Sequence, residues 1–178
     1  MIISPINPNK WEKIKEQIKG IDKAAMRRNR HFLFDEEDYL NMAKNPSLIW
    51  MGAFERSSLL GHIIGVSLDD AADEKVLNLK ELDSENVGKA NTIYIENFCV
   101  SPKKQKRGIG KSLMNGFIEG VVKQQKFHRV AGHFISTRAH HIFTTNSLTV
   151  PDKEILIPNY LYNRGGPAYY CARIIKES

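Results

Sequence analysis

The spacing of apolar and polar residues changes along the chain, and each change marks an expected element of secondary structure. The first apolar pair, Ile2–Ile3, predicts a short strand. Apolar residues then recur three or four positions apart, which predicts a helix over residues 9–20 that Gly20 ends. Four acids at 35–38 precede another apolar run and predict a second helix over 39–44. The chain is therefore expected to begin with one strand and two helices.

The middle of the chain favours strands. Two apolar runs, 47–55 and 59–68, flank the polar segment Arg56-Ser57-Ser58, which is a β-hairpin pattern. Residues 69–91 are polar and predict a long connection with one short helix. A further strand is expected over 92–100, where β-branched and aromatic residues are frequent.

The last part of the chain mixes clear and weak patterns. Residues 108–125 carry apolar side chains on one helical face, and 129–136 predict a strand. Residues 134–165 show little sustained periodicity and are expected to form an extended excursion, whereas 168–175 predict a terminal strand. Because no repeat, low-complexity tract or composition change divides the chain, we expect a single domain over 1–178.

The composition is ordinary for a globular protein, with 42% hydrophobic and 26% charged residues. The apolar runs are too short to cross a bilayer, and the N-terminal residues lack the pattern of a signal peptide. Cys99 and Cys171 are too few for a disulfide framework. The expected location is therefore the reducing cytoplasm, without a membrane partner.

The net charge of +6 and the pI near 9.3 could indicate a nucleic-acid partner. Much of the positive charge, however, gathers in the short segment 103–111. A phosphate-bearing ligand would account for that segment, so no nucleic-acid partner is expected.

That basic segment lies between an expected strand and an expected helix, and it contains Gly108 and Gly110. A loop of this kind builds an anion site, because the free N–H groups of the first helical turn and the positive end of the helix dipole meet there. Glycines let the backbone approach a bulky phosphate and permit positive φ. Residues 105–112 are therefore predicted to hold a phosphorylated ligand.

Two loop families compete for this segment, and an ordinary connection remains a third possibility. Gly110-Lys111-Ser112 fits the end of a P-loop, but that motif needs a glycine where this chain has Gln105. The other pattern, [RQ]-x-x-G-x-[GA], is met by Gln105, Gly108 and Gly110. Together with the preceding strand, the segment FCVSPKKQKRGIGKSLM resembles the acetyl-CoA-binding segment of the GNAT superfamily of N-acetyltransferases.

The resemblance implies an α/β (α+β) fold: a mixed, mostly antiparallel sheet of about six or seven strands with helices on both faces. It implies acetyl-CoA as co-substrate, with the pyrophosphate on the loop and the pantetheine arm along the preceding strand. That strand would splay from its neighbour and open a cleft for the reaction. The cofactor-binding residues implied are Phe98, Cys99, Val100, Gln105, Lys106, Arg107, Gly108, Ile109, Gly110, Lys111 and Ser112.

Glu96 is the candidate general base. It stands on the strand that enters the loop, and strict alternation would place it on one face with Tyr94, Phe98 and Val100. A carboxylate in such apolar surroundings suits proton transfer near neutral pH, and many members of the family carry a glutamate on this strand. The alternative is a structural carboxylate paired with a lysine or arginine.

Tyr162 is the candidate general acid. The segment 161–166 matches L-Y-x-x-x-G of a late family motif, whose tyrosine hydroxyl lies near the thioester sulfur. The match is partial, because Pro167 replaces a phenylalanine and Pro158 would interrupt a helix leading into the motif. A core or substrate-cleft role is the alternative for Tyr162, with Tyr160 as the replacement acid.

The histidines do not predict a metal site. His133, His140 and His141 lack paired cysteine or carboxylate spacing, and adjacent histidines on a strand would point to opposite faces. His133 is expected to be a core or cleft residue. Cys99 would need a partner histidine to act as a nucleophile, and an amine can attack a thioester directly.

The sequence therefore predicts an N-acetyltransferase that moves an acetyl group from acetyl-CoA to a primary amine by direct attack in a ternary complex. The acceptor would be a small molecule or a peptide, and residues 134–165 would cap its site or make a subunit contact, as in a homodimer. The acids at 35–38 either attract a cationic amine or cap their helix. A non-catalytic acetyl-CoA-binding module is the alternative, motivated by the departures at Pro158 and Pro167.

Overall fold

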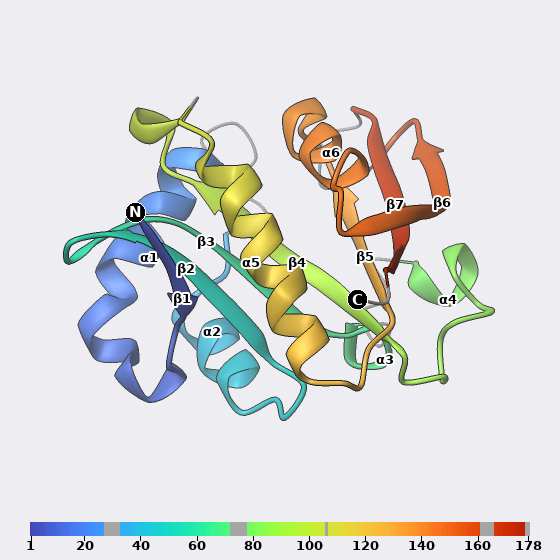
Figure 1. Ribbon diagram of the computed structural model, residues 1–178, viewed down its shortest axis with the longest axis horizontal. Helices are drawn as coiled ribbons and strands as arrows, with labels where there is room; N and C mark the ends of the chain where they lie inside the picture. The colour runs from blue at the N-terminus through green and yellow to red at the C-terminus, as the bar shows by residue number, and fades with distance from the viewer. Residues whose placement is uncertain (27–32, 72–77, 106, 161–165, 177–178) are drawn as a thin grey trace.

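The computed structural model describes residues 1–26, 33–71, 78–105, 107–160 and 166–176, and within these ranges the chain forms one seven-stranded sheet (Figure 1). The strand order is β1-β2-β3-β4-β5-β7-β6, and β4 with β5 is the parallel pair. The strands are β1 (Ile2–Pro5), β2 (Ile49–Glu55), β3 (Ser58–Ser67), β4 (Thr92–Val100), β5 (Arg129–Phe134), β6 (Thr149–Ile157) and β7 (Ala168–Ile175). The expected mixed, mostly antiparallel sheet is confirmed.

Helices cover both faces of the sheet (Figure 1). One core lies under α5 and α6, and a second lies under α1 and α2 on the opposite face. The helices are η1 (Pro8–Lys10), α1 (Trp11–Ala25), α2 (Glu36–Ala43), α3 (Leu68–Ala71), α4 (Leu79–Leu82), η4 (Pro102–Lys104), α5 (Ile109–Lys123) and α6 (Thr137–Thr144).

Helix α5 packs closely against the sheet because a glycine of β3, which has no side chain, lies beneath it. Leu113, Phe117 and Val121 on its apolar face are completely buried. A Cβ atom on Gly65 of β3 would lie only 2.6 Å from the Phe117 ring, so the glycine makes room for that ring. The tight contact sets where the first turn of α5 lies relative to the ends of β3 and β4.

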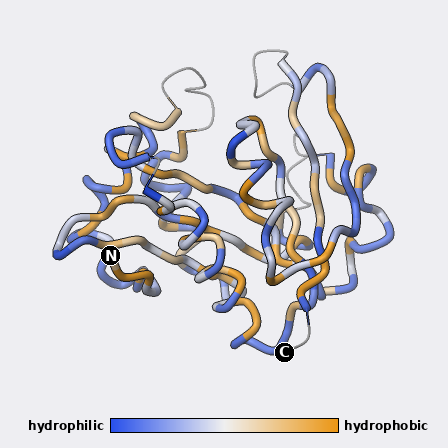
Figure 2. Tube along the Cα trace, turned by 45° about the horizontal axis from the view of Figure 1, so that its top comes forward, coloured by the Kyte–Doolittle hydropathy of each residue, from blue (hydrophilic) through white to orange (hydrophobic). Residues whose placement is uncertain are grey.

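Hydrophobic residues follow the strands and the buried helix faces, whereas many connecting loops are hydrophilic (Figure 2). Within the described ranges, no helix has both the length and the apolar character that a membrane crossing requires.

Helix α1 is longer than the sequence predicts. It runs through Gly20 to Ala25, because Ile18 and Ile21 lie on its buried face while Gly20 faces solvent. A glycine inside an exposed helical position costs about 1 kcal/mol relative to alanine. Burial of two isoleucines outweighs that cost, so the prediction that Gly20 ends the helix was wrong.

The start of α2 answers the question about the acids at 35–38. The Asp38 N–H donates to Asp35 Oδ1 at 3.0 Å, and the Asp35 N–H donates to Asp38 Oδ2 at 2.8 Å, which is a capping box. Glu36 accepts hydrogen bonds from Lys15 and Lys19 of α1. These acids therefore cap α2 and join it to α1.

Two connections contain more structure than expected. Residues 69–91 include α4, and α3 begins just before them at Leu68. Residues 134–165 contain α6, whose N-cap Ser136 accepts from the Ala139 N–H, and the edge strand β6. Because β6 alternates mostly between exposed and half-buried residues, it lacks the apolar alternation that marks a strand in a sequence.

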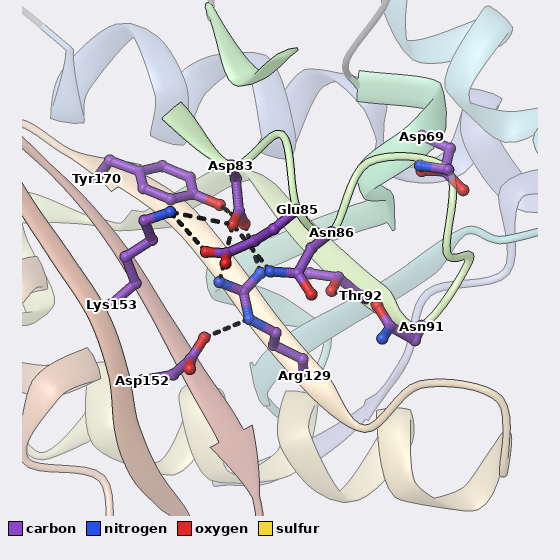
Figure 3. A network of polar contacts seen from close by, with 11 residues as sticks. Asp69, Asp83, Glu85, Asn86, Asn91, Thr92, Arg129, Asp152, Lys153 and Tyr170 are labelled. Carbon is purple, nitrogen blue, oxygen red and sulfur yellow. Dashed lines mark hydrogen bonds and ion pairs between the residues drawn. The ribbon is translucent and has the colours of Figure 1, made fainter. Parts of the chain in front are cut away.

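A buried polar network joins the connection before β4 to the strands β5, β6 and β7 (Figure 3). The Arg129 guanidinium at the start of β5 bonds Asp83, and the Tyr170 hydroxyl of β7 donates to the same carboxylate. Burial alone would raise the pKa of Asp83, but the hydrogen bonds from Arg129 and Tyr170 hold it below its ordinary value. Asp152 of β6 also accepts from Arg129, so the network ties β5 to β6 and β7.

Candidate active site

The parallel strands β4 and β5 part in the middle of the sheet. Their pairing runs from Thr92↔Arg129 to Ile95↔Gly132, although β4 continues to Val100 and β5 to Phe134. Figure 1 shows the two strands diverging beyond this point. We call the diverging segments, Glu96–Val100 and His133–Phe134, the β4–β5 splay. The divergence agrees with the splay implied by the family resemblance.

Glu96 lies at the base of the splay, in a β-bulge. The register between β3 and β4 passes from Gly65↔Ile95 to Ile64↔Asn97, so Glu96 is the inserted residue. A bulge bends a strand and re-aims side chains, and bulges are frequent beside active sites. Glu96 is half-buried.

The bulge corrects one expectation about the faces of β4. Phe98 and Val100 pack into the core under α5, whereas Tyr94 belongs to the core on the opposite face. Strict alternation would put all three side chains on one face, but the inserted residue at the bulge reverses the alternation. Glu96 therefore does not share one face with Tyr94, Phe98 and Val100.

The open edge of β4 offers backbone groups to a ligand. The Ser101 N–H donates to the Leu60 carbonyl of β3 at 2.8 Å. Because backbone groups alternate between the two edges of a strand, those of Val100 and Phe98 point away from β3, toward the side of β5. The Cys99 backbone faces β3 by the same alternation. The predicted pantetheine contacts thus suit Phe98 and Val100 better than Cys99.

The first turn of α5 has no side-chain cap. Its N-cap is Gly108, with φ of 74°, and the Ser112 N–H donates to the Gly108 carbonyl at 3.0 Å. The N–H groups of Ile109, Gly110 and Lys111 precede that bond and have no acceptor within the helix. A Cβ atom on Gly110 would lie 3.8 Å from Val100 Cγ2, so this turn begins beside the end of β4, where the anion site is predicted.

Three elements meet at Gly110. A Cβ atom there would lie 3.0 Å from Ile142 Cδ1 of α6 and 3.5 Å from Phe98 Cζ of β4. The glycine therefore allows α5 to begin against both neighbours. A Cβ atom on Gly108 would meet nothing within 4 Å, so the loop leaves open space at that position.

Cations surround the start of α5, and one acid holds two of them. Glu55 at the end of β2 pairs with Arg107 at 3.0 Å and with Lys104 at 3.9 Å. Lys103 and Lys111 are exposed. Gln105 is exposed as well, and Lys106 lies outside the described residues. The charge of this loop suits a polyanion.

On the β5 side of the splay, His133 is enclosed by tyrosines. Its Nδ1 lies 2.7 Å from the Tyr94 hydroxyl, and its ring stacks on Tyr160 at 5.1 Å between centroids. Tyr170 lies against the ring at 5.1 Å as well. Burial lowers the pKa of His133 to about 4, so the imidazole is neutral at physiological pH. Its Nε2 is buried and has no hydrogen-bond partner among the described residues.

The sequence did not single out this cluster, although it classed His133 as a core or cleft histidine. Tyr160, the replacement acid, is buried beside His133, and its N–H donates to the Gly166 carbonyl at 3.0 Å. Tyr162 lies outside the described residues, so its role as the general acid stays a prediction. The described residues before it form β6 and a turn, not the helix of the family motif.

Cys99 belongs to a chain of buried polar side chains on the face of β4 that is turned away from α5. Its thiol donates to Asn97 Oδ1 at 3.1 Å, and Asn97 in turn donates to the Tyr39 hydroxyl at 3.4 Å. That chain ends at Asp22, which accepts from Tyr39 and pairs with His62 at 2.8 Å. Burial, followed by the charge of Asp22, raises the pKa of Cys99 well above its ordinary value. This thiol is a poor nucleophile.

His140 and His141 lie on α6, not on a strand. The expectation that they point to opposite faces of a strand was therefore wrong. His140 Nε2 lies 3.0 Å from Glu154 of β6, close to the thiol of Cys171 on β7, whereas His141 is exposed.

Comparisons with known proteins agree with this geometry. The model of the acetyltransferase (GNAT) family matches residues 15–143, which include β4, the basic loop and α5. The chain belongs to the GNAT family. Membership supports the resemblance to the GNAT pattern, and the roles of the individual loop residues stay predictions.

Several solved structures of acetyltransferases share the fold. Aminoglycoside 6′-acetyltransferase type Ii matches with a TM-score of 0.68 and 16% identity over 100% of this chain and 99% of that chain. Arabidopsis thaliana NAA60 in complex with acetyl-CoA gives 0.66 and 20% over 98% of each chain. The ribosomal-protein-S18-alanine N-acetyltransferase from Escherichia coli gives 0.67 and 14% over 99% and 95%. A search of the curated proteins found no match.

Proposed function

We propose that this GNAT protein is an N-acetyltransferase that transfers an acetyl group from acetyl-CoA to a primary amine, within a ternary complex. The observation that carries the proposal is the uncapped first turn of α5, which lies against the open edge of β4 at Gly110. The two features lie side by side and offer backbone N–H and C=O groups. They suit a ligand with a pyrophosphate at one end and an amide-bearing arm at the other, as CoA has.

The binding of acetyl-CoA would use the helix start and the strand edge together. The pyrophosphate would accept from the N–H groups of Ile109, Gly110 and Lys111, with the exposed lysines adding positive charge. The pantetheine arm would follow the backbone of Phe98 and Val100 into the β4–β5 splay. The thioester would then lie near the base of the splay, where Glu96 and His133 are the first residues beyond the last paired position.

The reaction needs one proton acceptor. The amine nitrogen attacks the thioester carbonyl, the C–N bond forms, the C–S bond breaks, and CoA leaves as the thiol after gaining a proton. Glu96 is the proposed base, since it occupies the bulge at the base of the splay. His133 is the competing base, because its buried Nε2 has no partner among the described residues. Its pKa of about 4 makes it a weaker proton acceptor than a base poised near neutral pH. Glu96 and His133 are thus the two proposed candidates for the base.

Direct attack by the amine is favoured over a covalent relay. Cys99 stands on the strand that the pantetheine arm would follow, but its thiol contacts Asn97 and lies on the face of α1 and α2. Its raised pKa disfavours the thiolate. No acyl-cysteine intermediate is therefore proposed.

The acceptor is proposed to be a primary amine on a small molecule or a peptide. Solved structures with this fold include proteins named for aminoglycosides and for a ribosomal protein, which supports an amine but leaves its class open. Cys99 and Cys171 are both free and buried, in agreement with the proposed cytoplasmic location.

The test combines two measurements on the full chain. Calorimetry should find CoA and acetyl-CoA binding in the micromolar to millimolar range, and thiol release should rise with at least one amine of a broad panel. Absence of CoA binding would contradict the proposal. Binding without thiol release from any polyamine, aminoglycoside, lysine or peptide N-terminus would instead favour a non-catalytic acetyl-CoA-binding module.

A further inference from the structure

Helix α6 and the hairpin of β6 and β7 bring three metal-ligating side chains together, away from the β4–β5 splay. His140 comes from α6, Glu154 from β6 and Cys171 from β7. Glu154 and Cys171 stand directly opposite each other in the register of the two strands. The imidazole nitrogen, the carboxylate oxygen and the thiol sulfur all lie within 4.8 Å of one another.

The three groups are held in place by their surroundings. The His140 ring stacks on Tyr169 of β7, with centroids 4.2 Å apart and planes 21° apart. Its Nε2 lies 3.0 Å from Glu154 Oε1. Cys171 is 1% exposed and belongs to the core under α6, so its thiol lies on the side of the sheet that α6 covers.

A simple ion pair between His140 and Glu154 accounts for only part of this arrangement. It does not explain why a thiol converges on the same point from a third element of the fold. Imidazole, carboxylate and thiolate are together the ligand set of zinc, which binds them at about 2.0–2.3 Å in a tetrahedron. Such a tetrahedron needs ligand atoms roughly 3.3–3.8 Å apart, a small adjustment from the separations seen here.

We propose that His140, Glu154 and Cys171 form a zinc site, with water as the fourth ligand. The Glu154 side chain is 53% exposed, so solvent reaches the side of the cluster where that water would bind. The ion would bind the thiolate, and the Cys171 proton would pass to solvent on binding. No zinc contact is assigned to His141, which is exposed on the same helix.

The proposed site would join α6 to the β6–β7 hairpin. Helix α6 in turn lies against the start of α5, since Ile142 is the neighbour nearest to Gly110. A bound ion would therefore stabilise the wall of the fold next to the anion site without entering it. Three protein ligands and one water are the open arrangement of a zinc site. The proposal assigns the ion only the joining of α6 to the hairpin and is independent of the acetyl-transfer proposal.

Cobalt substitution tests the site directly. The full-length protein, stripped with a chelator under reducing conditions, is titrated with Co²⁺ and then with Zn²⁺. We expect one Co²⁺ per chain, a thiolate-to-cobalt absorption band in the near ultraviolet, visible bands of a tetrahedral ion, and loss of all bands when Zn²⁺ displaces Co²⁺. Zinc should also raise the Tm of the stripped protein. Absence of the thiolate band would overturn the proposal.

Variants identify the ligands. Cys171→Ser should abolish the thiolate band, and His140→Gln should weaken zinc binding at least about tenfold, the lower range known for disturbed metal sites. The matched control is His141→Gln, which removes the adjacent histidine of the same helix and should bind as the unmodified chain does. If Cys171→Ser does not fold, zinc binding is measured on Glu154→Gln instead, because the exposed Glu154 side chain can be changed without disturbing the core. Equal zinc affinity in Glu154→Gln, or equal losses in both histidine variants, would refute the assignment.

Discussion

The two sides of the β4–β5 splay are built from different kinds of groups. The donor side, formed by the start of α5 and the edge of β4, offers backbone N–H and C=O groups and open space at Gly108. The acceptor side consists of the half-buried His133 of β5 and of buried tyrosines from β4, β7 and the segment after β6. The donor side is exposed and cationic, whereas the acceptor side encloses, between tyrosines, an imidazole that is neutral at physiological pH.

This difference separates two tasks. Backbone donors bind phosphates with little dependence on side-chain identity, which suits a cofactor that is the same in every turnover. Buried side chains discriminate and transfer protons, because a low-dielectric environment shifts their pKa values and strengthens their hydrogen bonds. Substitutions on the donor side should therefore change cofactor affinity, and those on the acceptor side should change turnover.

The largest expected effect is on turnover. One of the two variants Glu96→Gln and His133→Gln should lower kcat by about 10²–10⁴-fold, the usual range for loss of a general base, because the proton acceptor is gone. Neither should change CoA affinity more than about twofold, which calorimetry checks beside the kinetic assay. A large loss of CoA affinity in both would erase the proposed division between the two sides.

His133 should also make stability depend on pH. The pKa of His133 is about 4 in the folded protein and 6.5 ordinarily, so the unfolded chain takes up a proton first as the pH falls. The free energy of unfolding should therefore be highest above pH 6.5 and should decrease by up to about 3 kcal/mol toward pH 4. Asp22 and Asp83 have lowered pKa values, so their contribution is lost only at more acidic pH.

Urea unfolding at several pH values between 7 and 4 measures this slope. His133→Phe keeps an aromatic ring against Tyr160 and Tyr170 but cannot titrate, so its stability should vary less across the same window. The same slope in both proteins would mean that His133 is not the group that titrates.

On the donor side, Gly108→Asp should weaken CoA binding by about 10–100-fold. A side chain and a negative charge would enter the open space, and losing a hydrogen bond to a charged group costs about 1.5–3 kcal/mol. Gly88→Asp is the matched control, since Gly88 also has positive φ, 86°, and nothing within 4 Å of a Cβ atom. Calorimetry on both folded variants checks the result, and equal losses at the two glycines would remove the anion site from α5.

The donor side was predictable from sequence because its parts are contiguous. The glycines, the cations and the start of the helix lie within residues 103–112, and the strand edge directly precedes them. Local spacing therefore predicted a phosphorylated ligand, and the family resemblance of the same segment implied acetyl-CoA. Family membership then confirmed the fold that this segment implied.

The acceptor side was not predictable, because sequence distance separates its members. Tyr94 and His133 meet across two strands, and Tyr160 reaches them after β6. The bulge at Glu96 depends on the register with β3, which no periodicity within β4 reveals. The edge strand β6 was missed for a related reason, since a strand with few buried residues carries no clear apolar pattern.

The smallest expected effect comes from the acid that holds two cations of the donor side. Glu55→Gln would release Lys104 and Arg107 and would remove a negative charge near the predicted anion site. The side chains of Glu55, Lys104 and Arg107 are 40–52% exposed. Exposed ion pairs contribute about 0–1 kcal/mol, so CoA binding should tighten only about two- to threefold at low salt. The gain should vanish near 1 M salt, where the Debye length falls to about 3 Å.

Glu119→Gln is the control for that change. It removes the same charge from an exposed position on α5, ten residues beyond Ile109 and hence about 15 Å along the helix. That distance exceeds the Debye length of about 8 Å at physiological salt, so CoA affinity should not change there. Equal tightening in both variants would mean that the net charge of the protein, rather than the local field at the start of α5, attracts the cofactor.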